Sequence, residues 1–99
     1  AGGMTLDEPA ADLALCAAIA SSHQNVSIGR WAVMGEVGLA GEVRAVAQAE
    51  RRLGECARMG FVNVLLPRGN LRGIPVPEGV KARGVDTLSE ALAAMGLVP

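Results

Sequence analysis

The spacing of apolar residues divides this chain into segments with helical and strand-like periods. Residues 7–22 read DEPAADLALCAAIASS, and positions 11–20 are apolar apart from Asp12. Pro9 suits the first position of a helix, and either acidic residue before it can cap the helix. A helix that is apolar nearly all round is buried on most sides, so we expect this one to lie deep in the fold.

Segment 30–46, RWAVMGEVGLAGEVRAV, is rich in glycine and suggests two different structures. Apolar residues alternate with other residues on both sides of positions 38–41. A phosphate-binding loop would open directly into a helix, usually with Lys and Ser or Thr behind the glycines, and this segment does neither. The sequence therefore predicts two strands joined by a glycine turn, preceded by a loop over residues 21–30.

The middle of the chain changes from a helical period to a continuous apolar run. Residues 47–60 place small and apolar side chains on one face and charged side chains largely on the other, which predicts an amphipathic helix. Gly60 is suited to cap its carboxyl end. Residues 61–67, FVNVLLP, are typical of a strand covered on both faces, and residues 68–79 are expected to form a loop.

The last two elements complete the fold class. Residues 80–85 are a plausible strand, and residues 86–96 are expected to form a helix. Thr87 and Glu90 have the spacing of a capping box, and Gly96 is placed to end this helix. The order helix, strand, strand, helix, strand, strand, helix indicates an α/β (α+β) domain with helices packed on a small mixed sheet.

Composition and charge set limits on function. The chain has 99 residues, of which 51% are hydrophobic and 19% charged, so one globular domain over residues 1–99 is expected. Nine basic residues face ten acidic ones, for a net charge of -1. Since a nucleic-acid-binding domain is usually basic, DNA binding would have to rest on a local patch. No apolar run approaches the ~18 residues that cross a bilayer, so we expect a cytoplasmic protein without membrane contact.

Four side chains have chemistry that needs an interpretation. Cys16 and Cys56 lie among apolar residues, which favours inert buried thiols over a disulfide or a ligand pair. His23 is the only histidine, so a metal site is poorly supported, and a solvated side chain is favoured over a ligand or base. Asp12 near a helix start is favoured there by the helix dipole, although a functional role stays open.

Three stretches resemble a known family when they are taken together. EPAADLALCAAIASS, GEVGLAGEVRAVAQAERRLGECARMGF and LLPRGN resemble the C-terminal domain of the bacterial RadA (Sms) family, whose members are ATP-dependent DNA repair and recombination proteins. The resemblance covers residues 1–97. It departs from the family at Ala45 and Ala47, where prolines are common.

The resemblance implies a fold and a larger protein. The fold would be that of the Lon proteolytic domain, which is like domain 2 of ribosomal protein S5. By this resemblance, the domain would help to assemble a hexameric ring and would support DNA binding during branch migration. The whole protein would be bacterial, cytoplasmic and associated with the nucleoid. ATP, Mg and zinc would belong to other domains of that protein, because this chain has neither a GxxxxGK[ST] motif nor a four-cysteine set. The family also places strands upstream of this chain, so we expect an incomplete sheet whose edge is covered either by a partner chain or by an upstream segment that was cleaved or lies outside this sequence.

The resemblance also allows a test for peptidase chemistry. Active Lon-type peptidases use a Ser–Lys dyad, with the serine after a proline at a helix start. Here that proline is Pro9, so Ala10 occupies the serine position. The lysine position, eleven residues after Gly41, is occupied by Arg52, which stays protonated and cannot act as a general base. No catalytic residue is therefore expected in this chain.

Several arginines are candidates for contacts with DNA phosphates. Positive side chains are concentrated within a fifteen-residue segment, at Arg44, Arg51, Arg52 and Arg58, and two more follow the expected strand 61–67, at Arg68 and Arg72. The alternative is a solvated helix face whose charge is balanced by neighbouring glutamates. Two other functions also stay open, a general α/β interaction module without a DNA role and a degenerate Lon-type serine peptidase.

Overall fold

The structure, a computed structural model, describes residues 8–99. Asp7, one of the two expected cap residues, lies outside this range. The elements in chain order are η1 (Pro9–Ala11), α1 (Asp12–Gln24), β1 (Trp31–Val33), β2 (Glu36–Val37), β3 (Val43–Arg44), α2 (Ala49–Arg58), β4 (Asn63–Pro67), η2 (Arg68–Leu71), β5 (Lys81–Val85) and α3 (Leu88–Ala94).

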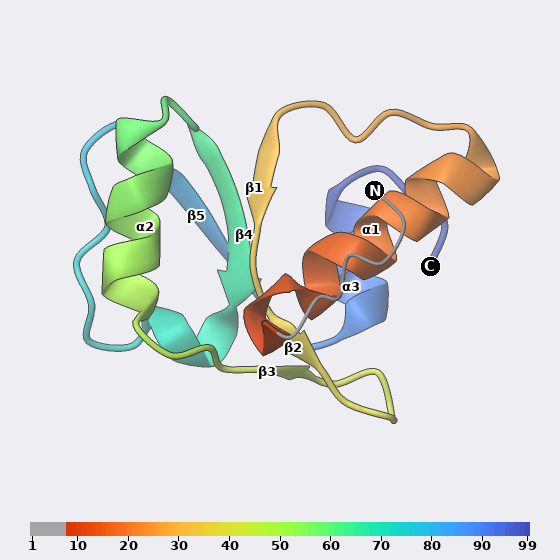
Figure 1. The fold of residues 1–99 in the computed structure, drawn as a ribbon, viewed down its shortest axis with the longest axis horizontal. Helices are drawn as coiled ribbons and strands as arrows, with labels where there is room; N and C mark the ends of the chain where they lie inside the picture. The colour runs from red at the N-terminus through yellow and green to blue at the C-terminus, as the bar shows by residue number, and fades with distance from the viewer. Residues whose placement is uncertain (1–7) are drawn as a thin grey trace.

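Three layers make up the molecule, as Figure 1 shows. The middle layer is a sheet with strand order β1-β4-β5, and all three strands are parallel. Helix α2 covers one face of this sheet, and α1 and α3 cover the other face (Figure 1). The antiparallel part of the expected mixed sheet is a separate two-stranded ribbon, β2-β3.

Strand β4 connects two hydrophobic cores because its side chains alternate between the faces of the sheet. Leu65 packs in the core with α1 and α3, whereas Val64 and Leu66 pack in the core with α2. All three side chains are fully buried. The expected strand covered on both faces is therefore confirmed, and it is the central strand of the sheet.

Helix α1 differs from its prediction in length and in burial. It continues past Ser22 to His23 and Gln24, where a loop was expected. Asn25 then adopts a left-handed conformation with φ of 56°, and its amide donates to the Ser22 carbonyl. The expectation of burial on most sides is wrong, because the helix packs on the sheet and α3 with one side only.

The two sides of α1 are clearly different. Leu13 and Ala17 are fully buried, whereas Leu15 and Ile19 are exposed by 45% and 61%. Asp12 near the helix start accepts a hydrogen bond from the Val37 amide at 3.2 Å. This contact joins α1 to the ribbon, and it gives the carboxylate a structural role.

The glycine turn joins two strands, as predicted, but the expected first strand is divided. Its first part, β1, pairs with β4 in the parallel sheet, and only β2 forms the hairpin with β3. Val37 is paired with Val43 across the ribbon, and the Gly38 amide donates to the Glu42 carbonyl at 2.8 Å. Gly41 has a φ of +82°, which residues other than glycine rarely adopt. The hairpin lies below the sheet in Figure 1, next to the start of α1.

Candidate functional site

A small hollow lies between the start of α1 and the segment that joins β3 to α2. Its volume is about 150 Å³. Its walls come from η1 and the residue before it, from β2 and from the joining segment: Glu8, Pro9, Ala10, Glu36, Ala45, Val46 and Ala47. Of the two positions that the family resemblance assigns to a peptidase dyad, Ala10 lines the hollow, and Arg52 contacts two of its lining residues, Glu8 and Ala47.

Arg52 closes one side of the hollow with two hydrogen bonds. Its Nη2 atom donates to Oε1 of Glu8 at 3.1 Å, and its Nε atom donates to the Ala47 carbonyl at 2.8 Å. The same Glu8 oxygen accepts the backbone amide of Ala10 at 3.3 Å. The structure therefore connects Arg52 to residue 10 through one carboxylate, although the two residues are far apart in the sequence.

The groups around this hollow limit its chemistry. The Ala10 side chain is a methyl group and only 6% of the residue is exposed. Among the described residues that line the hollow, none is a serine, threonine, cysteine or lysine. Nucleophilic catalysis needs such a side chain beside a group that removes its proton. The guanidinium of Arg52 stays protonated and is already bonded to a carboxylate.

Asn70 supports the wall of the hollow and was missed by the sequence interpretation. Its Oδ1 atom accepts the Val46 amide at 2.8 Å, and its Nδ2 atom donates to the Val46 carbonyl at 3.0 Å. One side chain thus satisfies both backbone groups of Val46, as a neighbouring strand would. The asparagine belongs to LLPRGN, one of the stretches that carry the family resemblance, but the pattern alone does not indicate its partner.

Ion pairs hold three of the four candidate DNA-binding arginines: Arg44, Arg52 and Arg58. Arg44 bonds to Glu42 at 2.8 Å and lies 3.9 Å from Glu36. The hydrogen bond from Arg44 lowers the pKa of Glu42 below its usual value. Arg58 pairs with Glu55 and lowers the pKa of that carboxyl in the same way. These pairs neutralise charge that a DNA phosphate would otherwise meet.

The other arginines are not all paired. Arg52 is paired with Glu8, as described above, whereas Arg51 forms no ion pair within residues 8–99 and donates to the neutral side chain of Gln48 at 3.4 Å. Arg68 bonds to Asp86 at 2.8 Å and to Glu90 at 3.2 Å. Its hydrogen bond to Asp86 raises the pKa of the arginine. The candidates therefore do not form one free positive patch.

The cysteines and the histidine lie apart from the hollow's lining. Cys16 and Cys56 are both free and half-buried, and burial raises the pKa of the Cys56 thiol. His23 is exposed near the end of α1. Within residues 8–99, no cluster of three or more side chains is arranged to hold a metal ion.

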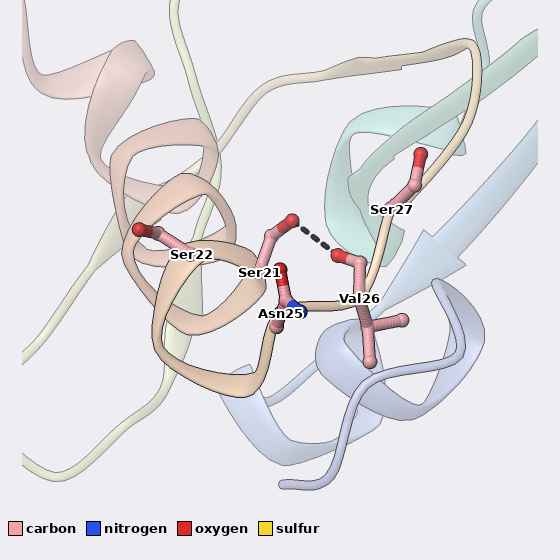
Figure 2. A pocket seen from close by; sticks show the side chains of 5 residues that line it. All are labelled: Ser21, Ser22, Asn25, Val26 and Ser27. Carbon is pink, nitrogen blue, oxygen red and sulfur yellow. Dashed lines mark hydrogen bonds between the residues drawn. The ribbon is translucent and has the colours of Figure 1, made fainter.

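A second hollow lies at the carboxyl end of α1. Its volume is about 490 Å³, and its lining is mostly polar: Ser21, Ser22, Asn25, Val26 and Ser27. Figure 2 shows the Ser21 hydroxyl directed at the Val26 carbonyl, to which it donates a hydrogen bond. This bond helps to close the turn after α1, and none of the lining residues carries a charge.

Within the described range, no helix has the length and apolar character needed to span a membrane.

The fold agrees with what comparisons of the sequence find. Residues 1–94 match the family described as the Lon protease (S16) C-terminal proteolytic domain. The chain is 45% identical over 96 residues to a DNA repair protein RadA of Streptococcus pyogenes, covering 96% of this chain and 21% of that protein.

Two other relatives give the same result. RadA of Streptococcus pneumoniae is 43% identical over 93% of this chain, and RadA of Listeria monocytogenes is 42% identical over 93%. This chain spans 22% and 20% of their lengths, so it corresponds to about a fifth of each relative. The chain therefore belongs to the family of Lon protease C-terminal proteolytic domains and, within that family, is similar to the RadA proteins.

Proposed function

We propose that this chain is a non-catalytic domain of a RadA-type DNA repair protein, and that it supports assembly and DNA binding instead of peptide cleavage. The observation that carries this proposal is the ion pair between Arg52 and Glu8 beside Ala10. An active site of the Lon type needs a nucleophile and a base at these positions. Here a methyl group and a protonated guanidinium occupy them, and the guanidinium donates one hydrogen bond to the Ala47 carbonyl and one to the Glu8 carboxylate.

Two features support a role in assembly. Strand β1 is an edge strand of the three-stranded sheet, and within residues 8–99 its outer side pairs with no other strand. Exposed edges tend to pair with another chain. The exposed side chains of Leu15 and Ile19 on α1 add apolar surface for contact with another chain. We propose self-association, as a hexameric ring, in the longer protein to which such a domain would belong.

The larger activities are proposals for that longer protein. ATP hydrolysis with Mg, zinc binding, recombination and branch migration would reside in it, because this chain represents about a fifth of the length of its RadA relatives. The contribution of this domain would be to hold the ring together and to place positive side chains near DNA. Such a protein would act in the bacterial cytoplasm, associated with the nucleoid.

A peptidase assay tests the non-catalytic part of the proposal. We expect the wild-type chain neither to cleave casein nor to react with a fluorophosphonate probe that labels activated serines. Ala10→Ser alone is the matched control, because it adds a hydroxyl while Arg52 still cannot act as a base. Labelling of the wild-type chain, or casein cleavage that copurifies with it through two independent columns, would overturn the proposal.

The alternative function is a general interaction module without a DNA role. The ion pairs of Arg44, Arg58 and Arg68 favour it, because they leave less free positive charge. Salt-dependent DNA binding separates the two functions, because phosphate contacts make log affinity fall linearly with log salt concentration. Measurable binding with a negative slope supports the DNA role, and no binding at low salt supports the interaction module.

A further inference from the structure

Strand β5 is the second edge of the three-stranded sheet. Within residues 8–99 it pairs only with β4, and Figure 1 shows it on the side of the sheet away from β1. The Lys81 amide donates to the Val62 carbonyl at 2.7 Å, so the backbone groups of Lys81 point toward β4. Because these groups alternate in direction along a strand, the N–H and C=O groups of Ala82 and Gly84 point outward.

The outward backbone groups of β5 are left without a strand to pair with. Within residues 8–99, no loop, turn or helix end forms a backbone hydrogen bond with the N–H or C=O of Ala82 or Gly84. An open edge of this kind can accept one more strand. Where that strand is an extended peptide of another protein, main-chain hydrogen bonds supply affinity and alternate side chains supply specificity.

Strand β5 also carries two positive charges without a partner. Lys81 and Arg83 are exposed, and neither forms an ion pair within residues 8–99. They are two residues apart, so both lie on one face of the sheet, about 6.6 Å from each other along the strand. Ala82 between them packs on the opposite face, against the core with α2. The carboxylate that follows the strand, Asp86, is already bonded to Arg68.

The two edges of the sheet differ in charge. Strand β1, at the other edge, reads WAV and has no charged residue. Positive side chains on an edge strand discourage pairing with apolar or basic strands. They favour a strand that is acidic at every second position, because opposite charges directly across two strands attract and like charges repel. The charges of β5 therefore discriminate between possible partners.

We propose that the β5 edge binds an extended acidic segment of a partner protein, which adds a strand to the sheet beside Ala82 and Gly84. Carboxylates at alternate positions of the segment face Lys81 and Arg83, since both strands share the period of two. This inference adds a protein partner to the proposed function. It depends neither on DNA binding nor on the absence of peptidase activity.

Peptide binding to the 99-residue chain tests the proposal. We expect a short fluorescein-labelled peptide that alternates Glu with Thr to bind in a saturable way. The same peptide with Lys in place of Glu should not bind, because its charges repel those of β5. A Glu–Thr peptide with N-methyl groups on three successive central amides keeps its charge but lacks the donors of a strand, so it should lose most of its affinity.

Variants of the two cations test the charge pairs. Lys81→Ala with Arg83→Ala should weaken binding of the Glu–Thr peptide about tenfold, because two cross-strand pairs are lost. Lys81→Glu with Arg83→Glu should exchange the preference and bind the Lys–Thr peptide. The matched control is Arg44→Ala with Arg58→Ala, which removes the same charge from exposed positions outside β5 and should keep the wild-type affinity.

Amide hydrogen exchange locates the added strand. Binding of the Glu–Thr peptide should slow the exchange of the Ala82 and Gly84 amides, because both gain an acceptor. The outward amides of β1, at Trp31 and Val33, are the internal control and should exchange at an unchanged rate.

Three results would overturn the inference. The first is no binding of the Glu–Thr peptide at low salt. The second is equal binding of the N-methylated peptide, which would show attraction between charges without an added strand. The third is slowed exchange at β1 and not at β5, which would place the peptide on the other edge. None of them changes the outcome expected from the peptidase assay or from the DNA-binding measurement, so the proposed function is tested separately.

Discussion

Asn70 is the residue whose removal should affect the candidate site most clearly without touching Arg52. Its amide group bonds to both the N–H and the C=O of Val46, in the wall of the hollow. Val46 is itself buried, so water reaches its backbone poorly. A backbone polar group that loses its partner in such a place costs the free energy of its lost hydration.

We predict that Asn70→Ala lowers the free energy of unfolding by about 1–3 kcal/mol, because both Val46 groups lose their partner. Asn70→Asp should also destabilise the fold, since it keeps an acceptor for the amide but places an oxygen against the carbonyl. Urea denaturation followed by circular dichroism measures both changes. Asn63→Ala, at an exposed position in β4, is the control and should change stability by less than about 0.5 kcal/mol. Equal effects of Asn70→Ala and Asn63→Ala would contradict the role of Asn70.

The site shows which residue contacts a sequence can indicate. The resemblance to the RadA family placed Ala10 and Arg52 at two related positions, and in the structure both bond to the Glu8 carboxylate beside one hollow. The pairing of Arg58 with Glu55 agrees with the alternative of a helix face balanced by its own glutamates, because residues three apart are neighbours on a helix. The sequence did not indicate that Glu8 would join Ala10 and Arg52, because that contact depends on how two distant segments pack.

The ends of the helices follow local rules, so the sequence predicted them well where the residue type is distinctive. Gly60 and Gly96 have φ values of +86° and +80°, and the residue after each donates its amide back across the last turn, Phe61 to Cys56 and Leu97 to Leu92. Thr87 accepts the Glu90 amide at 3.1 Å, as expected for the cap of α3. The end of α1 was missed because Asn25, a weaker signal than glycine, adopts the left-handed conformation there.

Two glycines of different conformation should respond to the same substitution with opposite signs. Gly96→Ala places a side chain at positive φ and should destabilise the fold by about 1–2 kcal/mol. Gly54 lies inside α2, and a Cβ built on it meets no atom within 4 Å. Gly54→Ala should therefore stabilise the fold by about 0.4–1 kcal/mol. Thermal unfolding midpoints measure both effects. Shifts of the same sign would be inconsistent with a helical Gly54 and a left-handed Gly96.

Across the molecule, packing decided what the local patterns left open. The apolar run of α1 suggested burial on most sides. In the structure, only one side of this helix packs against the sheet and α3, and Leu15 and Ile19 on the other side are exposed. The net charge of -1 suggested little free positive charge. Within residues 8–99, several arginines pair with carboxylates, but Lys81 and Arg83 on β5 form no ion pair. Neither result follows from composition, because both depend on which faces the fold brings together.

The two cores should behave as one cooperative unit, because β4 contributes to both. Leu65 is fully buried on the α1 and α3 side, and Leu66 is fully buried on the α2 side. We predict that Leu65→Ala and Leu66→Ala each lower the free energy of unfolding by about 2–5 kcal/mol, since each leaves a cavity next to the same backbone.

Either substitution should shift the whole unfolding transition without dividing it, because neither core can open while the central strand stays paired on both sides. The matched control is Leu39→Ala at the tip of the hairpin, where the side chain is fully exposed and its loss should cost less than about 0.5 kcal/mol. Urea denaturation with far-UV circular dichroism reports all helices, and Trp31 fluorescence reports the side of the sheet that carries α1 and α3. If Leu66→Ala moved the circular dichroism transition and left the Trp31 transition in place, α2 and its core would unfold separately, and the sheet would not couple the two layers.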